Sequence, residues 1–335
     1  MDFLQQKVLT TRRSLKYTYY VSPYDESTTQ HPVLFFIHGF PDSAHLWSGV
    51  VATLRSLPNR IIVPDCLGYA GTDKPSDTKL YAYKDQADDL EDILKAEKAE
   101  SSIIIGHDWG SALAQRAYLH KRELFVGVAL VNTPYLVPSD APFDLAAVNE
   151  ITEKALGYPQ FSYWELFTAP DAAEIIDANL ERMWLALHGD VDDWMKKLFC
   201  VPNAFRHFLL GSEEVPLKPY ASQLGRKEEF MKQFKSEEGF APALQMYKAT
   251  ASNIQSESDS TISKGNLAIE VPTLLFLCSK DAVCVPEMMA PARDMGLVPD
   301  LKEVVLDCAH WSPMEAADEL AAHIKEFVID RFLIE

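Results

Sequence analysis

A short run of residues around position 108 carries the clearest chemical information in the chain. The sequence GHDWG at residues 106–110 follows directly after the apolar stretch 102–105. A strand that ends in a tight turn between small residues is typical of a nucleophile elbow, which projects its central side chain. Glycines are expected at both ends because strand and helix approach too closely there for a Cβ. The central residue here is Asp108.

An aspartate at this position predicts attack on carbon by a carboxylate. A carboxylate is already ionised at neutral pH, so Asp108 needs no base to activate it. Attack on an acyl group would give an unstable anhydride, whereas attack on a saturated carbon with a leaving group gives an ordinary alkyl ester. The sequence therefore predicts an enzyme that opens a carbon–oxygen or carbon–halogen bond through a covalent intermediate.

The composition limits the class of protein and its location. The 335 residues are 47% apolar, enough for a large core, and 31 basic against 49 acidic side chains give a net charge of −18. Nucleic acids and anionic membrane surfaces attract basic patches, so this balance argues against both as partners. The amino terminus lacks the apolar core of a signal peptide, no stretch is long enough for a membrane span, and the five cysteines are scattered. We therefore expect a cytoplasmic protein.

Short apolar runs alternate with helical patterns along much of the chain. Such runs are typical of the buried strands of a parallel sheet, and the alternating segment 16–21 predicts an antiparallel strand before them. This order predicts an α/β fold, a mostly parallel twisted sheet flanked by helices. The predicted parallel strands are 33–37, 61–63, 102–105, 126–131, 273–277 and 304–306.

The alternation stops in the middle of the chain. Three prolines between residues 134 and 142 punctuate a hinge-like stretch, and residues 143–245 show a helical pattern with interspersed aromatic side chains. We therefore predict a core domain formed by residues 1–135 and 246–335, into which a helical cap (lid) domain, 136–245, is inserted. The polar tract 252–263 is interpreted as a surface loop.

Motifs able to do chemistry fall at the carboxyl ends of the predicted strands, where open α/β sheets place their active sites. Their chain order is nucleophile, acid, histidine, which is the order of the α/β-hydrolases. The sequence resembles that family over nearly its whole length, and within it the soluble epoxide hydrolases. The residues that carry this resemblance are His38-Gly39-Phe40-Pro41, Gly68-Tyr69-Ala70-Gly71, His107-Asp108-Trp109-Gly110, Asn132-Thr133-Pro134, Asp281 and His310.

The resemblance implies a two-step reaction that converts an epoxide into a vicinal diol. Asp108 would attack an epoxide carbon and form an alkyl ester. His310 would activate a water for attack on the ester carbonyl, and Asp281 would orient the imidazole and stabilise its charged form. No metal ion and no cofactor are expected. The partners would be a small-molecule epoxide and water, and the protein would be a monomer or a homodimer.

The same resemblance implies an oxyanion hole and the turn that supports it. The backbone amides of Phe40 and Trp109 would stabilise the negative charge that develops in the second step. His38, Gly39 and Pro41 would hold the turn that aims the Phe40 amide, with a cis peptide bond before Pro41.

Two tyrosines of the cap would supply the proton that the epoxide oxygen needs when the ring opens. Tyr163 and Tyr247 stand at positions that resemble the family's motifs. A phenol with a pKa of about 10 is protonated at neutral pH and can both bind the oxygen and donate to it. Together with Phe40, Trp109 and Trp311, these tyrosines are expected to line the substrate pocket.

Two other functions fit the same residues. A haloalkane or haloacid dehalogenase would share the fold and the aspartate nucleophile, but such enzymes carry a halide-binding Asn where this chain has Phe40, or an Arg where it has Trp109. Halide also leaves without a proton. A catalytically inactive receptor or scaffold of the same fold is a third alternative, against which the complete catalytic set argues. His107 and Cys308, which neighbour that set, are expected to be structural.

Overall fold

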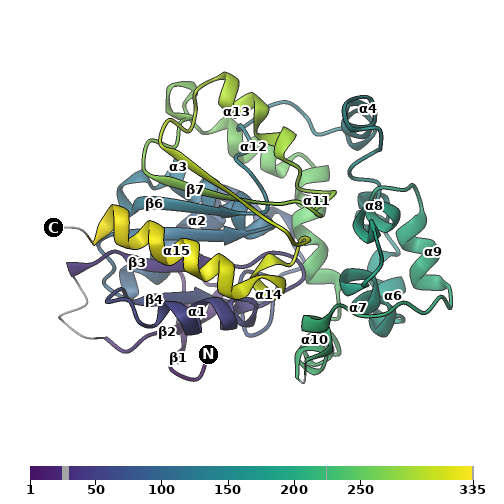
Figure 1. Cartoon of the computed structure of the whole chain (residues 1–335), viewed down its shortest axis with the longest axis horizontal. Coiled ribbons are helices and arrows are strands. Elements are labelled where there is room, and N and C mark those ends of the chain that lie inside the picture. The colour runs from purple at the N-terminus through teal and green to yellow at the C-terminus, as the bar shows by residue number, and fades with distance from the viewer. Residues whose placement is uncertain (25–29, 224, 334–335) are drawn as a thin grey trace.

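Eight strands form one sheet at the centre of the molecule (Figure 1). The computed structural model describes residues 1–24, 30–223 and 225–333. Across the sheet the order is β1-β2-β4-β3-β5-β6-β7-β8. The first two strands are antiparallel, and the six from β4 to β8 are parallel. The strands are β1 (Gln5–Thr10), β2 (Lys16–Val21), β3 (Val33–Ile37), β4 (Ile61–Pro64), β5 (Ser102–His107), β6 (Phe125–Val131), β7 (Thr273–Cys278) and β8 (Leu301–Leu306).

The central strands are apolar because helices cover both faces of the sheet. Every residue of β3, β4 and β5 is buried, and strands buried on both faces show continuous apolar runs rather than alternation. The predicted α/β fold class is therefore confirmed. One layer contains α1 and α15, and the other contains α2, α3 and α12 (Figure 1). The core helices are α1 (Ser48–Leu54), α2 (Tyr83–Ala96), α3 (Trp109–His120), α11 (Gln245–Ala251), α12 (Ile254–Ser260), α13 (Ala290–Asp294), α14 (Ser312–Glu315) and α15 (Ala317–Phe332).

The edges of the sheet differ from its centre. The sequence did not predict β1, whose residues are largely exposed and show no apolar alternation. The predicted strand 304–306 is the end of a longer edge strand, β8, whose first residues are partly exposed. Edge strands bury too little surface to impose a hydrophobic pattern. Among the described residues, the helices are too short or too polar to cross a membrane.

Seven helices between β6 and β7 form a cap at the carboxyl end of the strands (Figure 1). Helix α11 then carries the chain back into the core. The inserted helical cap agrees with the predicted fold class, while the domain boundaries at 135/136 and 245/246 stay a prediction. The cap helices are α4 (Leu145–Leu156), α5 (Trp164–Phe167), α6 (Ala172–Asp177), α7 (Leu180–His188), α8 (Trp194–Phe199), α9 (Ala204–Leu210) and α10 (Arg226–Phe234).

The interpretation of residues 252–263 as a surface loop is wrong, because most of this tract forms α12. Three of its polar residues, Gln255, Ser258 and Asp259, are buried, and their side chains are hydrogen-bonded to the core. Gln255 Oε1 accepts from Tyr83 N at 3.0 Å, and the Asp259 carboxylate pairs with both Nε and Nη2 of Arg116 at 2.7 and 2.8 Å. A buried polar helix face with internal partners has the same composition as a solvated loop, so the sequence alone could not separate them.

The linker between β6 and the cap is attached to α12 and the segment before it. Ser139 N donates to Asp259 Oδ2 at 3.1 Å, and Phe143 N donates to Asn253 Oδ1 at 2.7 Å. These bonds hold the backbone of the linker against the core at two points.

Candidate active site

Asp108 lies at the carboxyl end of β5, in the turn that leads into α3. Its backbone has φ 55° and ψ −125°, which is strained for a residue with a Cβ. A Cβ on Gly106 would lie 2.2 Å from the Gly110 oxygen, and one on Gly110 would lie 2.3 Å from the Ile37 oxygen. Only glycine fits at both positions, and the geometry is that of a nucleophile elbow.

The turn after β3 delivers a backbone amide to the same carboxylate. Phe40 N donates to Asp108 Oδ1 at 2.7 Å. A Cβ on Gly39 would lie 2.4 Å from that oxygen, so glycine is required for the approach. The His38 ring holds the turn, because its Nδ1 donates to Gly39 O at 2.9 Å and its Nε2 accepts a backbone amide at 2.8 Å. Burial lowers the pKa of His38 to about 4, so the ring is neutral. The Phe40–Pro41 peptide bond is cis, as the resemblance implied.

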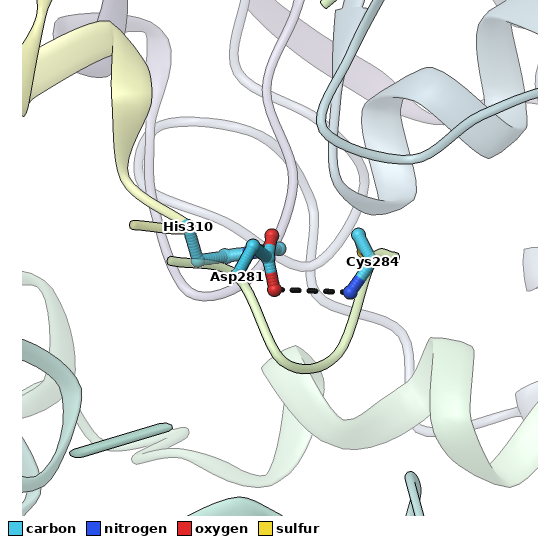
Figure 2. Close-up of side chains that lie close together, drawn as sticks. All are labelled: Asp281, Cys284 and His310. Carbon is cyan, nitrogen blue, oxygen red and sulfur yellow. Dashed lines mark hydrogen bonds and ion pairs between the residues drawn. The ribbon is translucent and has the colours of Figure 1, made fainter. Parts of the chain in front are cut away.

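Asp281 and His310 come from the loops after β7 and β8 and lie side by side (Figure 2). His310 Nδ1 is 2.7 Å from Asp281 Oδ2, and His310 Nε2 is 3.3 Å from Asp108 Oδ2. Asp281 and His310 are buried. The imidazole therefore bridges two carboxylates, and the structure brings together the three residues predicted to form the catalytic set.

Asp281 is held by four hydrogen bonds. Besides His310, it receives Val283 N and Cys284 N on Oδ1, both at 2.9 Å, and Asn132 Nδ2 on Oδ2 at 2.8 Å. Figure 2 shows the hydrogen bond from Cys284 N to Asp281, which joins the two sides of the loop after β7. Asn132, at the end of β6, had no predicted role. The sequence signal that could have identified Asn132 is its position directly after a parallel strand, which Asp108 shares.

The three charged groups shift one another's pKa values. Burial alone would raise the pKa of both carboxyl groups, but the His310 imidazole outweighs it. The pKa of Asp108 is lowered, and that of Asp281 falls to about 2. Burial would lower the pKa of His310, but Asp281 and Asp108 raise it well above its ordinary value. With Asp108 ionised, the imidazole is therefore protonated at neutral pH.

Asp281, Cys284 and His310 are also close enough to bind a metal ion, since their ligand atoms lie within 4.8 Å of one another. However, the hydrogen bonds above engage both Asp281 oxygens and His310 Nδ1. Cys284 Sγ lies 3.3 Å from Thr133 Oγ1, and burial raises the pKa of this thiol to about 11. A protonated thiol is a poor ligand, so this arrangement fits a hydrogen-bonded acid–base pair better. The absence of a metal and of a cofactor stays a prediction.

His107 and Cys308 both contact structural partners. His107 Nε2 donates to the backbone oxygen of His310 at 2.7 Å, and burial lowers the pKa of His107 to about 4. This neutral ring therefore fixes the main chain that carries His310. Cys308 Sγ lies 3.6 Å from Cys278 Sγ.

Tyr163 and Tyr247 face Asp108 from the opposite side. Tyr163 precedes α5 in the cap, whereas Tyr247 lies on α11, the helix that returns to the core, rather than inside the cap. Their ring centroids are 6.0 Å apart. Neither phenol makes a well-formed hydrogen bond to a described residue, and their near neighbours are each other and the indoles of Trp164 and Trp109. Burial raises the pKa of both phenols well above the ordinary value, so both are protonated.

Two spaces that share lining residues border Asp108. A cavity of about 410 Å³ is lined by Asp108, Trp109 and Tyr163 and by mostly apolar side chains. A second space of about 20 Å³, close to the size of one water molecule, is lined by residues that include Phe40, Asp108, Tyr163, Tyr247, His310 and Trp311. The residues predicted to line the pocket therefore all border these two spaces.

The chain belongs to the α/β-hydrolase fold family, whose model matches residues 32–317. It is 26% identical over 294 residues to the rat protein "Bifunctional epoxide hydrolase 2", covering 86% of this chain but only 50% of the rat protein. It thus spans about half the length of that relative. It is 27% identical over 308 residues to "Epoxide hydrolase A" of Mycobacterium tuberculosis, covering 89% of this chain and 90% of that one.

Solved structures show the same fold. An epoxide hydrolase from an endophytic Streptomyces superimposes with a TM-score of 0.79 at 22% identity, covering 98% of this chain and 96% of that one. Epoxide hydrolase A from Mycobacterium thermoresistibile gives 0.77 at 22% identity, covering 99% and 100%.

Proposed function

We propose that this protein is an epoxide hydrolase that forms vicinal diols through a covalent ester on Asp108. The observation that carries the proposal is the surroundings of that carboxylate. An ionised Asp108 accepts from the Phe40 amide, lies 3.3 Å from His310 and shares its cavity with two protonated phenols. The names of the relatives support the same activity.

In the first step, a carboxylate oxygen of Asp108 attacks one epoxide carbon and the carbon–oxygen bond of the ring breaks. The leaving oxygen becomes an alkoxide, which is far too basic to persist unprotonated. Tyr163 and Tyr247 lie where they can bind this oxygen and donate the proton, because their hydroxyl groups have no competing partner of good geometry.

In the second step, His310 takes a proton from a water as the water attacks the carbonyl carbon of the ester. Ester formation has removed the Asp108 charge that raised the pKa of His310, so this pKa falls, the imidazole releases its proton to solvent, and its neutral form can act as the base. The amides of Phe40 and Trp109 stabilise the negative charge on the ester oxygen. When this intermediate collapses, the ester carbon–oxygen bond breaks, and the leaving diol oxygen takes the proton from His310. Asp108 returns to a carboxylate, and the proton that it loses passes through solvent to the phenol that donated in the first step.

The environment of Phe40 argues against the dehalogenase. Its ring packs against the rings of Phe167, Phe240 and Tyr247. This apolar contact offers no amide to a halide, while the two phenols supply protons that a departing halide does not need.

A single turnover in heavy-oxygen water tests the mechanism. With enzyme in excess over an aryl epoxide, the diol should carry no label, and the label should appear in the peptide that contains Asp108. The added diol oxygen then comes from the protein. Labelled diol in the first turnover would mean direct attack by water and would overturn the ester mechanism, and release of halide from haloalkanes without epoxide turnover would favour the dehalogenase.

A further inference from the structure

The hydrogen bonds of buried tyrosines single out one more residue of the cavity. Ten tyrosines are buried among the described residues, and seven of them hydrogen-bond through their hydroxyl groups. The other three, Tyr83, Tyr163 and Tyr247, border the spaces at Asp108. Buried polar groups without partners are rare, so their grouping indicates that all three face a ligand. The proposed reaction uses two of them and leaves Tyr83 without a role.

Tyr83 is the first residue of α2 and is 5% exposed. Its hydroxyl bonds to no described residue and keeps some accessible surface, and Tyr83 lines the 410 Å³ cavity. The guanidinium of Arg116 lies 5.6 Å from the centroid of its ring. Arg116 follows Trp109 by two turns of α3, about 10 Å along the helix axis. The cavity therefore extends along α3 from Asp108 towards Tyr83.

The charges of this part of the wall disfavour an anionic ligand. The Arg116 guanidinium is already bonded to both oxygens of Asp259 and to the backbone oxygen of Leu136. The remaining charged side chains among the described lining residues are the carboxylates of Asp108 and Asp144. A carboxylate or phosphate would meet these acids without a free cation to pair with. A neutral donor or acceptor meets no such penalty.

We propose that Tyr83 binds a neutral hydrogen-bonding group, such as a hydroxyl or a carbonyl, that the substrate carries up to about 10 Å from its oxirane ring. The inference rests on the proposed function and names the substrate class, an elongated epoxide with a remote polar group. The apolar side chains between Asp108 and Tyr83, such as Ala112 and Leu136, contact the connecting carbon chain. Burial raises the pKa of Tyr83 far above neutrality, so its hydroxyl remains a donor.

A matched substrate series tests this role. Wild type and Tyr83→Phe are assayed with a linear alkyl epoxide, with its analogue bearing a hydroxyl about 10 Å from the ring, and with the corresponding carboxylate. We expect Tyr83→Phe to raise KM for the hydroxyl substrate roughly three- to tenfold, the range for one lost neutral hydrogen bond, and to leave KM for the alkyl epoxide unchanged. The carboxylate should be the poorest substrate of both proteins. Equal changes for all three substrates, or no change for any, would overturn the proposal.

Tyr81→Phe is the matched control, because its hydroxyl donates to Pro75 O instead of facing the cavity. It should leave the ratio of KM values at the wild-type level. Binding of the synthetic diols with and without the remote hydroxyl, followed by quenching of tryptophan fluorescence, separates this proposal from the proposed function. If wild type opens no epoxide, weaker binding of only the hydroxylated diol by Tyr83→Phe still supports the subsite, and identical binding rejects it.

Discussion

The two walls that enclose Asp108 hold their functional side chains by different forces. On the core wall, directional hydrogen bonds from backbone amides and a buried Asn132 position Asp281, and Asp281 positions His310. On the opposite wall, Tyr163 and Tyr247 are held by edge-to-face ring contacts, for example with Phe167. Directional bonds fix angles within narrow limits, whereas ring packing allows small shifts. The core wall therefore suits the nucleophile and base, and the opposite wall suits groups that must follow the shape of a substrate.

The largest effect on turnover should come from replacing His310, the proposed base on the core wall. His310→Gln should still form the ester but fail to hydrolyse it, which lowers turnover on the order of 10⁴-fold, as for triad members elsewhere. Intact-mass measurement should find the protein heavier by one substrate molecule, attached at Asp108. His323→Gln, on α15 away from the cavity, is the control. Steady turnover by His310→Gln would remove that residue from the mechanism.

Loss of both phenols should impair the other step. The pair Tyr163→Phe and Tyr247→Phe should slow ester formation by about 10²–10⁴-fold, the range for general acid catalysis, while each single change is milder because one phenol remains. Stopped-flow tryptophan fluorescence can follow this step. Tyr158→Phe serves as the control, since its hydroxyl donates to Ala282 O. Ester formation at the wild-type rate in the double variant would show that another group donates the proton.

A smaller loss of activity is expected when Asn132, which supports Asp281 on the core wall, is replaced. Asn132→Asp keeps the shape of the side chain but replaces the donor to Asp281 by a second carboxyl group. We expect ester hydrolysis to slow about 10- to 100-fold, which corresponds to the loss of a hydrogen bond to a charged group. Ester formation should change little, because the described side-chain hydrogen bonds of Asn132 go to Asp281 and Ser312 and not to Asp108. Equal slowing of both steps would indicate general damage to the site instead of a positioning role.

The smallest effect should appear in the pH dependence. In the free enzyme both carboxylates raise the pKa of His310, and ester formation removes the Asp108 charge, so the pKa of His310 should fall. Hydrolysis needs the neutral imidazole, so its rate should rise with pH through this lowered pKa. Ester formation needs only ionised Asp108 and protonated phenols, so its rate should stay level across neutral pH. Separate single-turnover profiles would measure the two steps, and a shared acidic limb would contradict the assignment.

The sequence predicted those parts of the molecule where packing allows only a few residue types. The buried strands β3 and β5 need continuous apolar runs, and the elbow needs Gly106 and Gly110 because no Cβ fits there. These features located Asp108 and the fold. Asp281 and His310 followed from their positions after strands.

The residues that the sequence missed are buried polar groups whose partners lie far away in the chain. Asn132 supports Asp281 across 149 positions, and Asp259 pairs with Arg116 across 143. Neither distance leaves a local pattern, so α12 was taken for a loop and Asn132 had no assigned role. The role proposed for Tyr83 could not be predicted either, because the lack of a hydrogen-bond partner among the described residues is visible only in three dimensions.

The attachment of the linker to α12 has a consequence for how molecules enter and leave. The backbone amides of Ser139 and Phe143 donate to the side chains of Asp259 and Asn253. Any outward swing of the cap about this linker must therefore first break two hydrogen bonds between backbone amides and side chains. The cap is therefore expected to pivot beyond Phe143, with the linker staying on the core. Access of substrate to Asp108 then depends on motions of α4, whose Val148 lines the cavity. Hydrogen exchange should find the amides of Ser139 and Phe143 slower than those of α4.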